Sequence, residues 1–172
     1  METEVNEFRA ELKAPLDAAV AQLAELDMAR IRKLLSRSPI AAIQLMFECC
    51  VYLLGSSDVS MRAVRQATHD ANFCVRLGQL DVTALTDEHV AFLTHRLDQI
   101  KMSVEHMYRV SDIGGTLLSY LQQSVRFWKR HREDLCPRYE RVQRLKENNT
   151  QQSLELGLKQ REARQLLSLI HI

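Results

Sequence analysis

The most apolar stretch of the chain, residues 39–54, contains two strongly polar side chains, Gln44 and Glu48. They are four residues apart, which places them on one face of a helix, so other elements must cover the rest of its circumference. Its expected limits are marked by a capping serine, a proline suited to the first helical position and a glycine suited to the residue past the end: Ser38, Pro39 and Gly55. About sixteen residues are too few to span a membrane comfortably. The pattern therefore predicts the central helix of a small helical core.

A narrow apolar stripe runs along residues 8–35, with spacings that alternate between four and three. Its members are Leu12, Leu16, Ala19, Leu23 and Leu26, then Ile31 and Leu34 after a skip. Such spacing is typical of one strand of a coiled coil, and the skip indicates a local change of register. Because proline lacks an N–H and clashes with the preceding turn, this helix is expected to begin or kink at Pro15. A second interruption is expected at residues 36–39.

Short helices are predicted between the apolar helix and residue 116. Their expected ranges are 61–68, 70–78, 86–100 and 103–113. Gly78 ends the second of them, and the pair Gly114-Gly115 ends the last. Short polar turns connect these helices, which indicates a compact bundle around the apolar helix.

A long return helix is predicted from residue 117, interrupted only at Pro137. Its apolar stripe is Leu117, Leu118, Leu121, Val125, Trp128, Leu135, Val142 and Leu145. This stripe needs a partner, and the stripe of residues 8–35 is the other unmatched one. Because the short helices lie between the two stripes, both long helices leave the bundle on the same side and must pair antiparallel.

These elements predict an all-α protein, a small globular bundle of short helices at the tip of an antiparallel two-helix coiled-coil stalk. The expected segments are the outgoing stalk helix at 1–38, the globular tip at 39–116, the return stalk helix at 117–150 and a frayed or poorly ordered tail at 151–172.

Composition and motifs narrow the function classes. Only 5 glycines and 3 prolines occur in 172 residues, which argues against an all-β or α/β protein. The four cysteines form no C-x-x-C pair and are expected to be buried, reduced thiols of an intracellular protein. No signal peptide, membrane span, phosphate-binding loop or nucleophile–base set is recognisable, and the histidines lack the spacing of metal ligands. We therefore expect no enzyme activity within this chain, no cofactor, no metal and no membrane partner.

Charge is unevenly distributed, although the net charge is +1. Residues 117–150 carry 8 basic and 4 acidic side chains, whereas residues 39–116 carry 6 basic and 9 acidic ones. The basic residues of the return helix are interrupted by acidic ones and spread around its circumference. This distribution is typical of a solvated helix surface and not of a nucleic-acid interface, so no nucleic-acid partner is expected.

Taken in order, the motifs resemble the distal stalk and microtubule-binding domain of dynein heavy chains over about residues 12–147. The matching residues are Ala14-Pro15-Leu16, Leu23 with Leu26, Ser38-Pro39, Ile43-Gln44-Leu45-Met46-Phe47-Glu48, Leu53-Leu54-Gly55, Asp70-x-Asn72-Phe73 with Leu77 and Asp81, Glu105-x-x-x-Arg109-Val110-Ser111, and Pro137 with Val142 and Leu145. None of these is specific alone, and their order and spacing together carry the resemblance. The Asp70-x-Asn72-Phe73 motif is closer to axonemal than to cytoplasmic dyneins.

The chain departs from that pattern at four places. The family commonly has Pro-Pro where this chain has Ser38-Pro39, a lysine at the place of Gln44, and a tryptophan near residues 59–61. The spacing from Ser111 to Pro137 is about one residue longer than in the family, which puts the register of the return helix in question.

The resemblance implies a non-enzymatic part of a motor whose ATPase ring lies outside this chain. Its implied partners are tubulin in the microtubule and the rest of the heavy chain, in the cytoskeleton and particularly in the cilium. In dyneins the two stalk helices slide past each other and switch the tip between weak and strong microtubule binding. The implied microtubule contacts are Gln44, Arg76, Glu105 and Arg109, and the implied stalk hinges are Pro39 and Pro137.

Two other interpretations remain open at this point. Glu105 and Arg109 also fit a surface pair at i and i+4 that needs no partner. The whole chain also fits a helical coiled-coil adaptor that binds partner helices and has no affinity for tubulin. The adaptor requires the apolar stripe of residues 12–35 to be exposed, whereas the stalk requires it to pack against residues 117–147.

Overall fold

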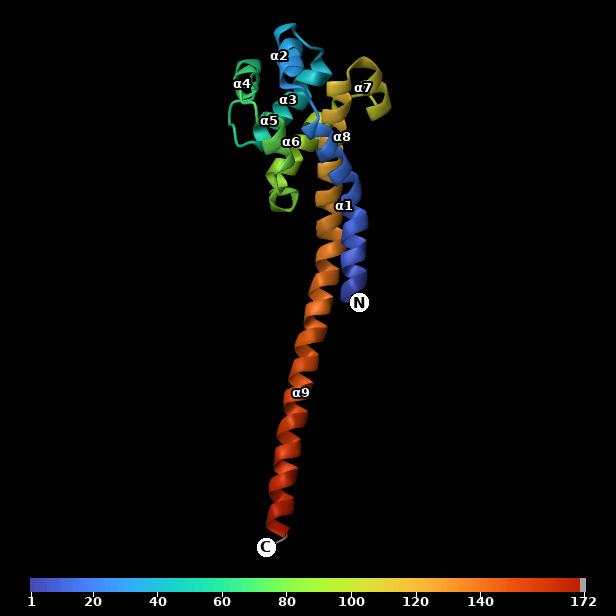
Figure 1. Cartoon of the computed structure of the whole chain (residues 1–172), viewed down its shortest axis with the longest axis vertical. Coiled ribbons are helices and arrows are strands. Elements are labelled where there is room, and N and C mark those ends of the chain that lie inside the picture. The colour runs from blue at the N-terminus through green and yellow to red at the C-terminus, as the bar shows by residue number, and fades with distance from the viewer. Residues whose placement is uncertain (171–172) are drawn as a thin grey trace.

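The computed structural model describes residues 1–170, and all regular structure within them is helical. The helices are α1 (Glu2–Ala24), α2 (Met28–Ser36), α3 (Ala41–Leu53), α4 (Met61–Ala67), α5 (Phe73–Gly78), α6 (Asp87–Asp98), α7 (Val104–Val110), α8 (Asp112–Arg130) and α9 (Cys136–Ile170), with a 3-10 turn η1 (Val82–Ala84) and a π turn η2 (His131–Leu135). The predicted all-α class is confirmed. A small bundle forms one end of the molecule, and α1 runs antiparallel to α8 and the start of α9, which continues alone past the N-terminus (Figure 1).

Helix α3 is the centre of the bundle, as its apolar sequence predicts. Met46, Phe47 and Cys50 on this helix are completely buried, and α3 contacts α4, α6 and α8. Gly55 has the predicted left-handed conformation, with φ 91°. The expected start at Pro39 is wrong, because α3 begins at Ala41.

The expectation of one outgoing helix up to residue 35 is also wrong. Helix α1 passes through Pro15 and ends at Ala24, and α2 begins after a three-residue break at the place where the apolar stripe skips. Asp27 caps α2, since its carboxylate accepts a hydrogen bond from the Ala29 N–H at 2.9 Å. The skip in the stripe therefore marks the end of one helix and not a change of register within it.

The glycine pair Gly114-Gly115 lies inside α8 and does not end the preceding helix. Ser111 ends α7 and also caps α8, its hydroxyl accepting from the Gly114 N–H at 3.1 Å. A Cβ on Gly115 would lie 2.4 Å from the ring of Tyr108, and one on Gly114 would lie 3.0 Å from the sulfur of Met107. The glycines allow α7 to pack directly on α8, and the return helix consequently begins at Asp112 and not at residue 117.

The expected poorly ordered tail is helical as far as the structure describes it. Helix α9 continues to Ile170, and residues 171–172 lie outside the described residues. No side chain of α9 is fully buried. Glutamine, glutamate, arginine, lysine and leucine, which are good helix formers, dominate its distal half, so local propensity supports this helix where tertiary contacts do not.

A π turn joins α8 to α9 immediately before Pro137. The N–H of Cys136 donates to the carbonyl of His131, five residues back instead of four. A π turn contains one residue more than an α turn. The turn lies within the interval from Ser111 to Pro137, which is expected to be about one residue longer than in dyneins.

Candidate functional site

The polar face of α3 is turned inward. The Gln44 side-chain amide donates to the carbonyl of Pro39 at 2.7 Å. Glu48 forms an ion pair with Arg96 of α6 at 2.9 Å, and each side chain is only about one quarter exposed. The Nε of Arg96 is not aligned for a hydrogen bond with any group of the described chain. Gln44, one of the implied microtubule contacts, therefore bonds to the loop before α3, and Glu48 on the same face pairs with α6.

Arg76 is exposed but already paired. It contacts Asp70 at 3.0 Å, and the other oxygen of that carboxylate accepts from the Asn72 N–H at 2.8 Å. The hydrogen bond from Asn72, followed by the one from Arg76, lowers the pKa of Asp70. Phe73, the next residue of the motif, is buried beside Phe47 with ring centroids 6.4 Å apart. The Asp70-x-Asn72-Phe73 motif is thus a turn that anchors α5 to α3.

Glu105 and Arg109 lie on α7, and both are exposed. They form no ion pair with each other, and the Arg109 side chain has no polar partner within residues 1–170. Val110 beside it is 50% exposed. Helix α7 therefore presents an unpaired cation and an apolar side chain together.

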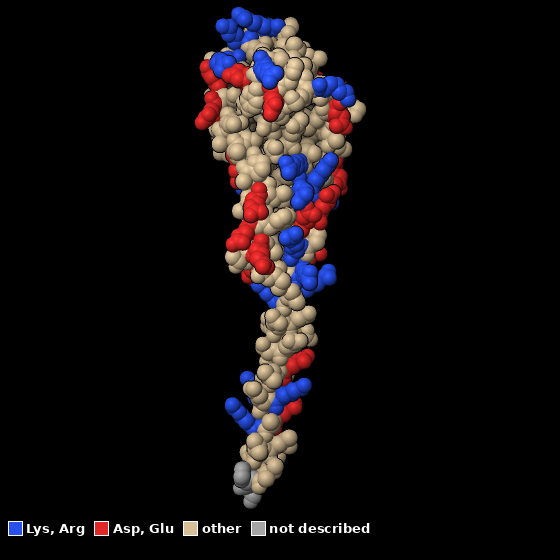
Figure 2. Space-filling model, turned by 90° about the vertical axis from the view of Figure 1, so that its right-hand side faces the viewer, with Lys and Arg blue, Asp and Glu red and all other residues tan. Residues whose placement is uncertain are grey.

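Sequence analysis did not single out α2, which adds further cations to the same end of the molecule. A groove of about 360 Å³ lies between α2 and the α7–α8 junction. Its lining residues are Arg30, Lys33, Leu34, Arg37, Val110, Ser111, Asp112 and Ile113. The side chains of Lys33 and Arg37 have no polar partner in the described chain. Figure 1 places α2, α4 and α7 at the end farthest from α9, and Figure 2 shows basic side chains at that end with acidic ones beside and below them.

Two arginines hold α2 in place on this surface. Arg30 forms a bidentate pair with Asp112, both distances being 2.8 Å, and this pair lowers the pKa of Asp112. Arg65 of α4 donates to the carbonyl of Leu35 at 3.2 Å. The spacing of Arg30, Lys33 and Arg37 on one helical face was visible in the sequence, but their partner Asp112 is 82 residues away from Arg30.

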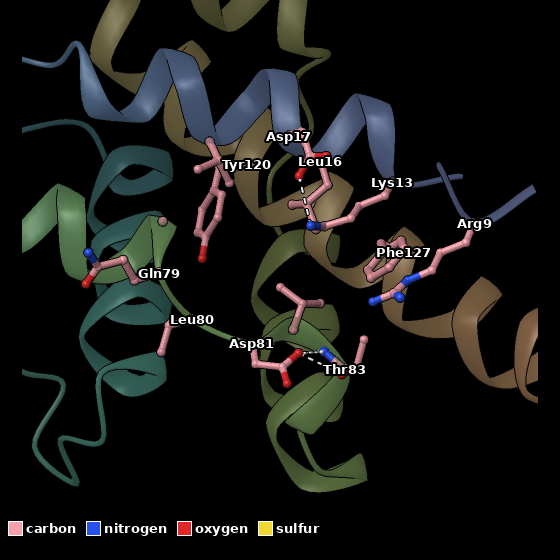
Figure 3. A pocket seen from close by; sticks show the side chains of 13 residues that line it. Arg9, Lys13, Leu16, Asp17, Gln79, Leu80, Asp81, Thr83, Tyr120 and Phe127 are labelled. Atoms are coloured by element: carbon pink, nitrogen blue, oxygen red, sulfur yellow. Dashed lines mark hydrogen bonds and ion pairs between the residues drawn. The ribbon is translucent and has the colours of Figure 1, made fainter. Parts of the chain in front are cut away.

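A second cleft, of about 310 Å³, lies where α1 meets the bundle (Figure 3). Arg9, Lys13 and Leu16 of α1 face the loop from Gln79 to Thr83 across it. The hydroxyl of the buried Tyr120 donates to the carbonyl of Leu77 at 2.7 Å, and burial raises the pKa of that tyrosine. A Cβ on Gly78 would lie 3.0 Å from Val20, so glycine lets α5 approach α1 closely. The cleft is the joint through which the outgoing helix contacts the tip.

The two proposed hinge prolines lie at different kinds of joint. Pro39 follows Ser38, whose φ of 52° is left-handed, in the loop between α2 and α3. Pro137 lies in the first turn of α9, directly after the π turn. Within residues 1–170, no cleft lined by catalytic side chains lies at either proline.

The buried cysteine thiols and the remaining polar side chains of residues 1–170 add no reactive group or metal site to the clefts described above. Burial raises the pKa of Cys49 to about 12 and that of Cys74 to about 11, so both remain protonated at neutral pH. Within residues 1–170 no three His, Cys, Asp or Glu side chains are grouped closely enough to hold a metal ion. No helix in the described chain combines the length and apolar character needed to cross a membrane.

Comparison with curated proteins gives one informative similarity. The chain is 26% identical over 140 residues to human dynein axonemal heavy chain 10. The match covers 81% of this chain and 3% of that protein, so the chain spans a small part of its relative's length. No protein-family model matches the chain. The similarity relates this sequence to a short segment of an axonemal dynein heavy chain.

Proposed function

We propose that this chain is the microtubule-binding tip and the adjoining stalk of a dynein heavy chain of the axonemal type. The similarity to dynein axonemal heavy chain 10 and the arrangement of a helical bundle on two antiparallel long helices both support this function. One observation carries the proposal. The end of the molecule opposite the C-terminal end of α9 presents unpaired cations, Lys33, Arg37 and Arg109, around a groove with the exposed apolar Val110.

Tubulin presents an acidic surface, to which such cations are complementary. In this proposal Arg109 is a direct contact, as the resemblance implies, and Lys33 and Arg37 add to it. Arg76 contributes to binding only if it leaves Asp70 and pairs with an acidic group of tubulin. Glu105 is itself acidic and contributes no attraction to an acidic surface. Gln44 supports the tip from within and makes no contact with the microtubule.

Tubulin affinity is set, in the same proposal, by movement of α1 along α8 and α9. Such movement reaches α2 through the short break at residues 25–27, and α2 is linked to α8 by Arg30 and Asp112. The ATPase ring of the parent motor lies elsewhere in the heavy chain, so this segment binds and does not hydrolyse. The rest of the heavy chain is its second partner, and the axoneme of a cilium is its location.

Co-sedimentation of the purified chain with microtubules tests this function. We expect binding that weakens as salt concentration rises, and that differs between variants whose α1 and α9 are locked by disulfides in different registers. Absence of binding in every locked register at low salt would rule the function out.

The adaptor as posed from the sequence required an exposed stripe along residues 12–35, and the structure counts against it, because Leu16, Ala19 and Leu23 are buried and α1 packs along α8. One different observation favours an adaptor, since the distal part of α9 exposes large apolar side chains. These are Leu154, Leu156, Leu158, Leu166, Leu167, Leu169 and Ile170. If the adaptor function holds, a chain shortened to residue 150 loses its partner, whereas under the dynein function it still binds microtubules.

A further inference from the structure

The second cleft, between α1 and the loop from Gln79 to Thr83, has an apolar floor and charged walls (Figure 3). Its floor includes Leu16, Val82 and Phe127, each of which is buried. Its volume of about 310 Å³ is at the lower end of the range for ligand pockets, so it admits a small molecule and not a partner helix. The cleft is separate from the groove at the tip, because α1, α5, α8 and the loop line it instead of α2 and α7.

One wall of the cleft carries a cation without an ionic partner. Arg9 extends from α1 alongside Phe127 toward the loop (Figure 3), and its guanidinium forms no ion pair within residues 1–170. The neighbouring Lys13 differs, because it pairs with Asp17 on the same helix at 3.4 Å. Arg9 is therefore the cation of α1 that remains available to a ligand.

The opposite wall carries a carboxylate with one oxygen unbonded. Oδ1 of Asp81 accepts hydrogen bonds from the Thr83 N–H at 3.0 Å and from the Thr83 hydroxyl at 2.6 Å, whereas Oδ2 has no hydrogen-bond donor in the described chain. These hydrogen bonds, followed by the charges of His131 and Arg9, lower the pKa of Asp81. The carboxylate is therefore ionised at neutral pH, and the turn fixes its direction.

The charges of Arg9 and Asp81 lie on opposite sides of the cleft and form no ion pair with each other. A ligand with only a negative charge would be repelled by Asp81, and one with only a positive charge would be repelled by Arg9. A ligand with both charges can form a charge-assisted hydrogen bond with each wall. Both side chains are exposed, so such a ligand reaches them from solvent.

We propose that this cleft binds a small zwitterion with an apolar side chain, the chemistry of a free aliphatic α-amino acid. The ligand's carboxylate pairs with Arg9, its ammonium group donates to Oδ2 of Asp81, and its side chain covers the apolar floor at Leu16, Val82 and Phe127. The site is independent of the groove at the tip and of tubulin binding, and it is tested without microtubules.

Titration of the full chain with L-leucine, followed by ¹H–¹⁵N NMR, tests the site. We expect saturable shifts of the backbone amide signals of residues 79–83, with a dissociation constant in the low millimolar range or tighter. The amide signals of residues 33–37 at the tip should stay unchanged. Absence of saturable shifts in residues 79–83 up to about 20 mM leucine would overturn the proposal.

Three analogues separate the roles of the ligand's groups on the unaltered protein. 4-Methylpentanoate lacks the ammonium group, leucinamide lacks the carboxylate, and glycine lacks the apolar side chain. Each should bind at least about tenfold more weakly than leucine. If either singly charged analogue binds as tightly as leucine, the zwitterion is the wrong ligand class. This comparison does not require any variant to fold.

Two variants locate the binding on the proposed walls. Arg9→Gln and Asp81→Asn should each weaken leucine binding by about tenfold or more, and asparagine keeps an oxygen that can accept from Thr83. Asp58→Asn is the matched control, because Asp58 accepts from the Ser60 N–H at 2.9 Å in a similar turn outside the cleft. It should bind leucine like the parent. Parental affinity in both wall variants, or an equal loss in the control, would contradict the site.

Discussion

Arg30 of α2 and Asp112 at the start of α8 hold each other through two parallel hydrogen bonds of 2.8 Å. The pair joins the helix that follows α1 to the return helix, across one side of the groove at the tip. Both side chains are more than half exposed, so their contribution to overall stability is small. Their effect is on the orientation of α2.

We therefore expect Asp112→Ala to weaken microtubule binding with little change in the midpoint of urea unfolding. Removal of the carboxylate should free α2 to move relative to α7, which would disperse the cations that we propose face tubulin. The exchanged pair Arg30→Asp with Asp112→Arg should recover binding. Asp17→Ala, which removes the Lys13–Asp17 pair on α1 at 3.4 Å, is the matched control and should bind like the parent. Equal loss of binding in both alanine variants would contradict this role.

Two charge-reversal variants of the tip surface, the single Arg109→Glu and the double Lys33→Glu with Arg37→Glu, should each weaken microtubule binding by about tenfold or more. Each change replaces an unpaired cation near the groove by an anion that an acidic surface repels. Co-sedimentation at two salt concentrations measures the effect, and the difference between parent and variant should shrink at the higher one. Arg126→Glu reverses an exposed cation on α8, away from the tip, and should leave affinity nearly unchanged.

Gln44→Ala should destabilise the fold by about 1 kcal/mol without a direct loss of tubulin affinity. The variant leaves the carbonyl of Pro39 without the hydrogen bond that the Gln44 amide donates at 2.7 Å. Urea unfolding measures the stability, and co-sedimentation well below the unfolding transition measures the affinity. A large loss of affinity in a fully folded variant would show that Gln44 faces the track, as the family resemblance implies.

Gly115→Ala should destabilise the bundle by about 1–3 kcal/mol, because its Cβ would lie 2.4–2.7 Å from ring atoms of Tyr108. Gly157→Ala on α9 has open space around the new Cβ. It should instead increase the helical signal in circular dichroism, since alanine favours a helix interior by about 1 kcal/mol over glycine. Thermal unfolding of the two variants against the parent provides the comparison.

Stability should fall as pH decreases through the titration of His131. Burial, followed by the charge of Arg9, lowers the pKa of this histidine below 6.5, while the charge of Asp81 acts in the opposite direction. A lowered pKa means that the folded state resists protonation, so stability is highest above pH 6.5 and declines from there until the folded-state pKa is passed. His131→Gln should show a flatter dependence of the urea midpoint between pH 7.5 and 5. An unchanged slope would mean that other groups cause the decline.

Hydrophobic pattern predicted the helical class and the central helix because burial of an uninterrupted apolar face dominates the energetics of α3. It could not place helix ends that depend on tertiary contacts. Gly114 and Gly115 looked like a helix terminator, yet their small size serves the approach of α7 to α8. The break after α1 was visible as a skip in the stripe, but Pro15, the stronger local signal, turned out to lie within a continuous helix.

The site was less predictable than the fold, for a related reason. Single polar residues on an apolar helix look functional in sequence, but the pattern alone could not show that Gln44 bonds to the Pro39 carbonyl or that Glu48 pairs with Arg96. The cations of α2 look like an ordinary amphipathic surface until the chain folds and brings Asp112 beside Arg30. The π turn lies in the interval from Ser111 to Pro137, where the resemblance to dyneins leads us to expect about one additional residue.

Ser111 ends α7 and begins α8 without any linker between them. Helix α7 is therefore joined directly to the return helix and packs on it, while α2 is joined by three residues to the outgoing one. The two sides of the groove at the tip thus belong to different long helices. Under the proposed function, displacement of one long helix along the other would act on the two sides of that groove, against the Arg30–Asp112 pair that links them.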